Sequence, residues 1–173
     1  MLIVVTGGSG SGKSALAETI AMNRGTPRVY IATMEPWGEE AQARIKRHKK
    51  MRETKKFKTI EQYVSLEKTP VLPNQVVLVE CMSNLCANEL FQEDGAGSQA
   101  VEAIMRGVRL LCERQKAVVL VTNEVFSDGI HYEEETMQYI RILGELNQQL
   151  AEYADVVVEC VYGIPVILKG ELV

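Results

Sequence analysis

The sequence has little of what metal-binding, disulfide-bonded or membrane-spanning proteins need. It contains two histidines, and its four cysteines are scattered without a Cys-x-x-Cys pair. We therefore expect no zinc site and read the cysteines as reduced, mostly buried thiols. No apolar run approaches the roughly 20 residues of a membrane helix, and the short apolar start lacks the basic leader of a signal peptide. A cytoplasmic protein without stable membrane insertion is expected.

The order of apolar and polar segments predicts the fold class. The chain has 173 residues, which suits one compact domain. The apolar runs expected to form strands are residues 2–6, 28–33, 76–80, 117–122, 156–161 and 166–168. The segments with helical spacing are residues 13–22, 37–52, 83–91, 98–115 and 133–153. This alternation predicts an α/β protein with a mostly parallel sheet and helices on both faces.

Two segments stand apart from this alternation. The last two strands are joined at residues 163–165 by Gly-Ile-Pro, which reads as a tight turn. We therefore expect an antiparallel hairpin at one edge of the sheet. Residues 36–73 are the least strand-like part of the chain, and we expect them to project from the sheet as a basic helical segment.

A phosphate-binding loop follows the first expected strand. Residues 7–14 match G-x-x-x-x-G-K-[ST] in full, between a strand and a helix. The predicted nucleotide-binding residues of this loop are Gly7, Gly8, Ser9, Gly10, Ser11, Gly12, Lys13 and Ser14. Lys13 is expected to reach the β- and γ-phosphates, and the Ser14 hydroxyl is expected to bind Mg²⁺. Residues 1–173 are thus predicted to form a single P-loop nucleotide-binding domain of the RecA-like class.

A second Mg²⁺ contact is expected from an acid at the end of a neighbouring apolar strand. Glu80 ends the run Val-Val-Leu-Val-Glu and can hold the ion directly or through water. The alternative is an acid that merely faces solvent at a strand end. Asp155 precedes its strand, so it lies at the opposite end of the sheet and is expected to be a cap.

A basic helix carries one of the two histidines. Residues 44–58 hold nine of the 19 Lys and Arg residues, although the whole chain has a net charge of −4. Arg44, His48 and Arg52 recur every four residues and share one face. A neutral imidazole can attack an α-phosphorus, and the nearby cations would stabilise the developing charge. Spacing alone favours a solvated basic face over a catalytic one. A local patch on an acidic protein suits a small anion better than a nucleic-acid track.

Several blocks along the chain carry a family resemblance. They are Val4-Val5-Thr6-Gly7-Gly8, Tyr30-Ile31-Ala32-Thr33, Arg44-Ile45-x-x-His48-x-x-x-Arg52, Thr59-x-Glu61, Glu80-Cys81-Met82, Val121-Thr122-Asn123-Glu124-Val125, Leu146-Asn147-Gln148-x-Leu150-Ala151-x-x-Ala154-Asp155 and Gly163-Ile164-Pro165. In this order and spacing, the chain resembles the bifunctional adenosylcobinamide kinase/adenosylcobinamide-phosphate guanylyltransferase family of cobalamin biosynthesis. The resemblance covers nearly the whole chain.

The resemblance implies two reactions and a set of site residues. The family phosphorylates adenosylcobinamide with ATP or GTP, then transfers GMP from GTP to that phosphate through a GMP-histidine intermediate. It implies His48 as the nucleophile, beside Lys13 as the second catalytic residue. The further nucleotide contacts that it implies are Ile31, Ala32, Thr33, Lys49, Lys50, Met51, Arg52, Glu61 and Glu80. Family members are homotrimers, in which the P-loop and the histidine helix could come from adjacent subunits.

The chain departs from the family pattern at several positions. Gly10 and Phe57 stand where the family has Arg and Trp, and residues 126–132 replace a glycine-rich segment. The kinase donor, the exact corrinoid acceptor and the retention of both steps are therefore open. Two other functions also remain: a P-loop kinase of another small alcohol, and a non-enzymatic nucleotide-dependent switch or nucleic-acid module.

Overall fold

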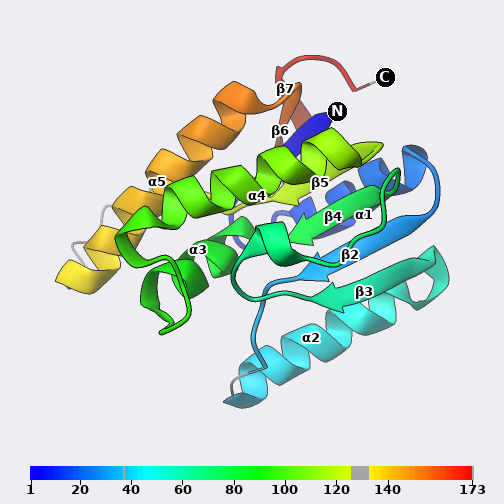
Figure 1. The fold of residues 1–173 in the computed structure, drawn as a ribbon. Helices are drawn as coiled ribbons and strands as arrows, with labels where there is room; N and C mark the ends of the chain where they lie inside the picture. The colour runs from blue at the N-terminus through cyan, green and yellow to red at the C-terminus, as the bar shows by residue number, and fades with distance from the viewer. Residues whose placement is uncertain (37, 126–132, 173) are drawn as a thin grey trace.

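A single mixed sheet organises the chain in a computed structural model that describes residues 1–36, 38–125 and 133–172 (Figure 1). Its strands are β1 (Leu2–Thr6), β2 (Arg28–Ala32), β3 (Phe57–Glu61), β4 (Val76–Glu80), β5 (Ala117–Val121), β6 (Val156–Val161) and β7 (Ile164–Lys169). The spatial order is β3-β2-β4-β5-β1-β6-β7. Every pairing is parallel except the antiparallel β6–β7 pair. The predicted parallel α/β sheet with an antiparallel edge hairpin is confirmed.

Helices cover both faces of this sheet (Figure 1). The helices are α1 (Lys13–Asn23), α2 (Gly38–Arg52), α3 (Met82–Phe91), α4 (Ala100–Arg114) and α5 (Glu134–Tyr153). Alternate residues of β1 face opposite sides, so Val4 joins the core under α3, α4 and α5, whereas Val5 joins the core under α1. The helix α2 lies beside β3 at the sheet edge.

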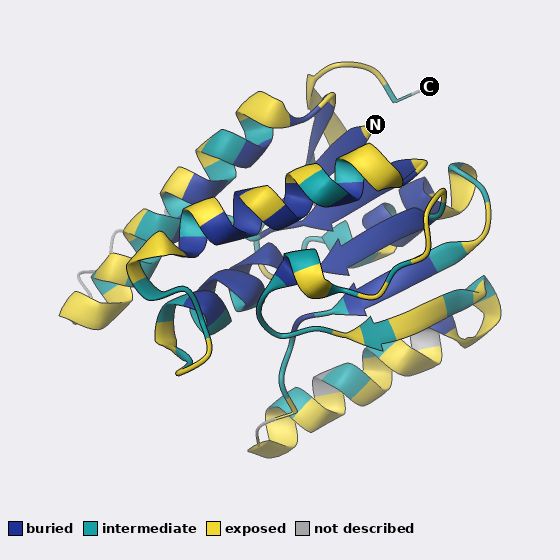
Figure 2. Cartoon of the chain, in the orientation of Figure 1, coloured by how far each residue is buried: buried dark blue, intermediate teal, exposed yellow. Residues whose placement is uncertain are grey.

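The central strands form the most deeply buried part of the molecule (Figure 2). Every residue of β4 and of β5 is buried. Strands covered by helices on both faces need apolar side chains on both, which explains their unbroken Val- and Leu-rich runs. Because β4 and β5 are parallel, their C-terminal ends lie together, and the residues that follow them are held on a rigid base.

Two sequence expectations about the sheet were wrong. Residues 36–73 contain the strand β3, which pairs with β2. Its pattern escaped detection because an edge strand on a half-covered face needs few apolar residues: Lys58, Thr59 and Glu61 are exposed. The final turn consists of Tyr162 and Gly163, not residues 163–165, because both have the positive φ angles of a two-residue hairpin turn.

The other expectations from composition can be compared with the described residues. All four cysteines are free; Cys81, Cys86 and Cys160 are buried, and Cys112 is half-buried, which confirms the reading as thiols. Burial raises the pKa of Cys86 to about 12 and that of Cys112 to about 11. Among the described helices, none is long and apolar enough to cross a membrane.

Candidate active site

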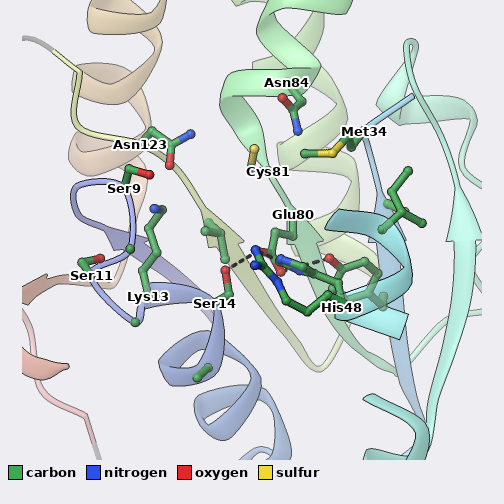
Figure 3. Close-up of a pocket in the computed structure, with 18 of the residues that line it drawn as sticks. Ser9, Ser11, Lys13, Ser14, Met34, His48, Glu80, Cys81, Asn84 and Asn123 are labelled. Atoms are coloured by element: carbon green, nitrogen blue, oxygen red, sulfur yellow. Dashed lines mark hydrogen bonds and ion pairs between the residues drawn. The ribbon is translucent and has the colours of Figure 1, made fainter. Parts of the chain in front are cut away.

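A cavity of about 450 Å³ lies at the carboxyl edge of the sheet, where β1, β2, β4 and β5 end (Figure 3). The P-loop forms one wall and α2 forms another. The lining residues among those predicted are Ser9, Gly10, Ser11, Gly12, Lys13, Ser14, Ala32, His48, Lys49, Arg52, Glu61 and Glu80. In open α/β sheets, ligands bind at this edge. Within one chain, the P-loop and the histidine helix therefore both contribute to this cavity.

The P-loop has the backbone geometry that its glycines allow. Gly10 and Gly12 have φ angles of 72° and 93°, and α1 begins directly after them at Lys13. The Lys13 ammonium donates to the carbonyl of Gly8 at 3.0 Å, so its side chain curls over the loop. A β-carbon on Gly7 would lie 2.7 Å from the carbonyl oxygen of Cys160, which leaves room only for glycine. The loop and the helix N-terminus together suit bound phosphate.

The carboxylate of Glu80 joins three elements of the site. Its Oε1 accepts a hydrogen bond from the Ser14 hydroxyl and lies 3.6 Å from Nδ1 of His48. Its Oε2 accepts a hydrogen bond from the Tyr30 hydroxyl at 3.0 Å. Burial, followed by the nearby negative charge of Glu80, raises the pKa of Tyr30 far above its usual range, so the phenol stays a donor. Glu80 thus faces the cavity and is not an acid facing bulk solvent.

The chemistry of Ser14 and Glu80 fits a magnesium ion. Mg²⁺ prefers hard oxygen ligands and is held by one or two carboxylates together with substrate phosphates. The Ser14 hydroxyl and the Glu80 carboxylate already meet in a hydrogen bond beside the P-loop. Within the described residues, no cluster of three or more His, Cys, Asp or Glu side chains could hold a metal. An ion here would therefore share these two oxygens with phosphates.

The helix α2 places a guanidinium and an imidazole at the cavity. The guanidinium carbon of Arg52 lies 3.4 Å from the centre of the Tyr30 ring, which is a cation–π contact. Arg52 is buried, yet its Nε and Nη1 have no hydrogen-bond partner among the described residues. Buried N–H groups are nearly always paired, so these donors fit an anionic ligand in the cavity. Arg44 was expected on the same face, but its side chain lies outside the described part.

The basic run is only partly a solvated face. Lys49 lies 3.5 Å from Glu61, with both side chains more than half exposed. Lys55 pairs with the buried carboxylate of Glu18 on α1. Lys49, Lys55 and the buried Arg52 thus contact other residues of this domain. The alternative of a solvated basic face is therefore wrong for Arg52 and Lys55.

Six predicted nucleotide contacts are not among the described residues that line the cavity: Gly7 and Gly8 at the start of the P-loop, and Ile31, Thr33, Lys50 and Met51. Ile31 points into the core on the opposite face of the sheet. The Thr33 hydroxyl donates to the carbonyl of Cys81 and accepts from its N–H, and Thr33 is not among the lining residues. Lys50 lies at a separate shallow depression of α2. The side chain of Met51 and residues 126–132, where the sequence departs from the family pattern, lie outside the described structure.

Sequence reasoning missed several residues that line the cavity. Tyr30 lies one position before the predicted segment, and the two-residue alternation of β2 turns Tyr30 and Ala32 to the cavity. That alternation was the available signal. Asn84, Asn123 and Glu124 also line the cavity. Asn123 and Glu124 follow the buried strand β5, and the same strand-end argument used for Glu80 could have identified them.

Comparisons with known proteins agree with the site. Residues 3–168 match the family described as cobinamide kinase/cobinamide phosphate guanyltransferase. The bifunctional adenosylcobalamin biosynthesis protein CobU of Escherichia coli is 38% identical, over 98% of this chain and 100% of that protein. CobU of Salmonella typhimurium is 37% identical with the same coverage. CobP of Pseudomonas aeruginosa is 30% identical over 97% of each chain.

Solved structures with a related arrangement are far more distant. A KaiC-like protein from Pyrococcus horikoshii is 14% identical, with a TM-score of 0.48, and the match covers 91% of this chain and 71% of that chain. The sequence relatives and the family match extend over nearly the full length of the chain. The chain therefore belongs to the cobinamide kinase/cobinamide phosphate guanyltransferase family of enzymes.

Proposed function

We propose that this enzyme phosphorylates adenosylcobinamide with ATP or GTP and then transfers GMP from GTP to adenosylcobinamide phosphate through His48. The observation that carries the proposal is that His48 and residues 9–14 of the P-loop line one cavity. A P-loop alone would suit a kinase acting at the γ-phosphate. A histidine beside it adds a nucleophile for the α-phosphate, and the family gives the corrinoid acceptor.

The neighbours of His48 favour attack through its outer ring nitrogen. Nδ1 lies 3.6 Å from the Glu80 carboxylate, which favours a proton on that nitrogen. The lone pair is then on Nε2, because a neutral imidazole carries its proton on one nitrogen only. Nε2 attacks the α-phosphorus of GTP, the bond from that phosphorus to the bridging oxygen breaks, and pyrophosphate leaves. An oxygen of the acceptor phosphate then attacks the same phosphorus and releases the histidine.

Cations around the cavity supply the charge stabilisation that both steps need. Arg52 has two donors that lack a partner among the described residues and can reach phosphate oxygens, and Lys49 lines the same wall. Lys13 curls over the P-loop, where it would contact the β- and γ-phosphates. Bound Mg²⁺, held by Ser14 and Glu80, would neutralise further charge on the phosphates. Fixed positive groups of this kind account for most phosphoryl-transfer catalysis.

A labelling experiment tests the nucleotidyl step. The protein is incubated with α-labelled GTP and Mg²⁺, and the adduct is then treated with acid and with base. We expect an acid-labile, base-stable label that is absent from His48→Ala. His131→Ala is the matched control, because His131 is the only other histidine in the sequence. A wild-type protein that takes up no label, or a His48→Ala variant that keeps it, would refute covalent transfer through His48.

The proposal includes a homotrimer. The hairpin strand β7 is exposed along its whole length, and its side chains include Ile164, Val166, Ile167 and Leu168. Contiguous exposed apolar surface of this kind commonly marks an interface between chains. Light scattering should give three times the chain mass of 19.3 kDa. A monomeric mass at micromolar concentration would refute the assembly without affecting the chemistry.

A further inference from the structure

Glu124 is an acidic residue that lines the cavity and has no role in the proposed nucleotidyl step. Val121 on β5 pairs with Val5 of β1 and with Glu80 of β4, so these three residues lie at one level of the sheet. Glu124 lies three residues beyond that level. Its backbone N–H donates to the carbonyl of Gly7 at 3.3 Å, which fixes it beside the start of the P-loop. It therefore lies further out from the sheet edge than Glu80.

The two other carboxylates among the described lining residues, Glu80 and Glu61, both contact side chains of α2. Glu80 bridges Ser14, Tyr30 and His48. Glu61 lies 3.5 Å from Lys49 and accepts a hydrogen bond from Tyr63. Glu124 instead follows β5, the strand between β1 and β4. The described lining thus has a third acidic residue, which lies beside Gly7 at the start of the P-loop and is separate from the two acids that contact α2.

Polar groups surround this side of the cavity and hold it in place. The amide of Asn123 donates to the Ser83 hydroxyl at 2.6 Å, and its backbone carbonyl accepts from Asn147 on α5 at 3.2 Å. In Figure 3, Asn123 lies on the Lys13 side of the cavity, with Ser14 between it and His48. Asn84 contributes a further amide to the lining. An amide that is held in place next to a carboxylate, as Asn123 is next to Glu124, suits an alcohol, which both donates and accepts hydrogen bonds.

We propose that Glu124 is the general base of the kinase step and that Asn123 and Asn84 bind the acceptor alcohol beside it. This inference rests on the proposed kinase function. The Glu124 carboxylate takes the proton of the acceptor hydroxyl as its oxygen attacks the γ-phosphorus. The bond between the γ-phosphorus and the β–γ bridging oxygen breaks, and the nucleoside diphosphate leaves with that electron pair. The proton on Glu124 then passes to solvent.

This assignment divides the two reactions between two acids in one cavity. Glu80 contacts His48 for transfer at the α-phosphate and would hold Mg²⁺ in both steps, whereas Glu124 serves only transfer at the γ-phosphate. Removing the Glu124 carboxylate should therefore impair the kinase reaction and leave guanylylation of His48 unchanged. A general base contributes roughly 100-fold or more to a rate, which makes the difference easy to measure.

The experiment measures both activities in Glu124→Gln. Phosphorylation of adenosylcobinamide is followed with γ-labelled nucleotide, and guanylylation of His48 is followed with α-labelled GTP. We expect the kinase kcat to fall about 100-fold, while the KM for nucleotide and the rate of His48 labelling stay unchanged. Glu159→Gln is the matched control, because Glu159 aligns with Thr6 on the other side of β1 and does not line the cavity within the described part.

Each outcome decides the inference. A Glu124→Gln variant with undiminished kinase kcat would refute the base assignment, and so would parallel loss of kinase activity and labelling. If Glu124→Gln does not fold, Glu124→Asp keeps a carboxylate and should retain more kinase activity than Glu124→Ala, with labelling equal in both. A wild-type enzyme that labels His48 but never phosphorylates adenosylcobinamide would instead refute the proposed kinase function and, with it, this inference.

Discussion

The hydroxyl of Tyr30 offers a direct test of how the site is held together. Tyr30→Phe removes one oxygen, which donates a hydrogen bond to Oε2 of Glu80 at 3.0 Å. The aromatic ring stays, and with it the contact to the Arg52 guanidinium at 3.4 Å. The variant therefore separates the hydrogen bond from the packing and from the cation–π contact.

The expected loss follows from the burial and charge of the acceptor. Tyr30 is 4% exposed and Glu80 is 9% exposed, so water cannot readily replace the missing donor. A hydrogen bond to a charged group is worth about 1.5–3 kcal/mol. Because Glu80 keeps Ser14 as a donor, we expect a loss in unfolding free energy near the lower end, about 1.5 kcal/mol. The freed carboxylate should also orient His48 less well, which should slow guanylylation.

The assay is urea unfolding of the nucleotide-free protein, with Tyr63→Phe as the matched control. Tyr63 donates to Glu61 in the same way, at 3.1 Å, but that pair is exposed. An exposed pair of this kind should contribute less than about 0.5 kcal/mol. Equal losses in the two variants, or an undiminished stability and labelling rate in Tyr30→Phe, would refute the role given to burial and to Glu80.

Three further predictions concern packing, ionisation and metal. Gly107→Ala should lower the melting temperature, because the new β-carbon would lie 2.8 Å from that of Leu66 and overpacking costs about 1–3 kcal/mol; a raised melting temperature would contradict this. Burial raises the pKa of Cys112 to about 11 from a usual 9.0, so the thiol of the unfolded chain loses its proton at lower pH than the thiol of the folded protein. The free energy of unfolding should therefore fall between pH 9 and 11, and this fall should be smaller in Cys112→Ala. Chelation of Mg²⁺ should abolish guanylylation, and Ser14→Ala should need more Mg²⁺ for half-maximal labelling; labelling that is insensitive to the chelator would argue against the Ser14–Glu80 ion site.

The features that the sequence predicted well are those encoded within a few neighbouring residues. The P-loop is a contiguous motif, and Glu80 ends an unbroken apolar strand. Both could be placed without knowing which strands are neighbours. The parallel sheet followed from the same local alternation of strands and helices.

The features that escaped depend on contacts between distant segments. Tyr30 lies in the site because β2 pairs with β4, which aligns Ala32 with Glu80 across the sheet. The strand β3 carries mostly polar side chains at an edge, so its identity depends on pairing with β2 and not on its own pattern. The burial of Arg52 follows from the position of α2 against Tyr30. A list of residues along one chain does not contain these distances.

The weak anchoring of α2 has a consequence for local unfolding. Among its described side chains only Arg52 is buried, whereas β4 and β5 are buried throughout (Figure 2). Segments with few buried apolar contacts open at lower free energy than the core. Backbone amides of α2 should therefore exchange with solvent deuterium long before those of the central strands. The helix α2, which carries His48, should therefore unfold locally while the P-loop and Glu80 remain folded. Nucleotide bound in the cavity should slow hydrogen exchange in α2 more than in any strand of the central sheet.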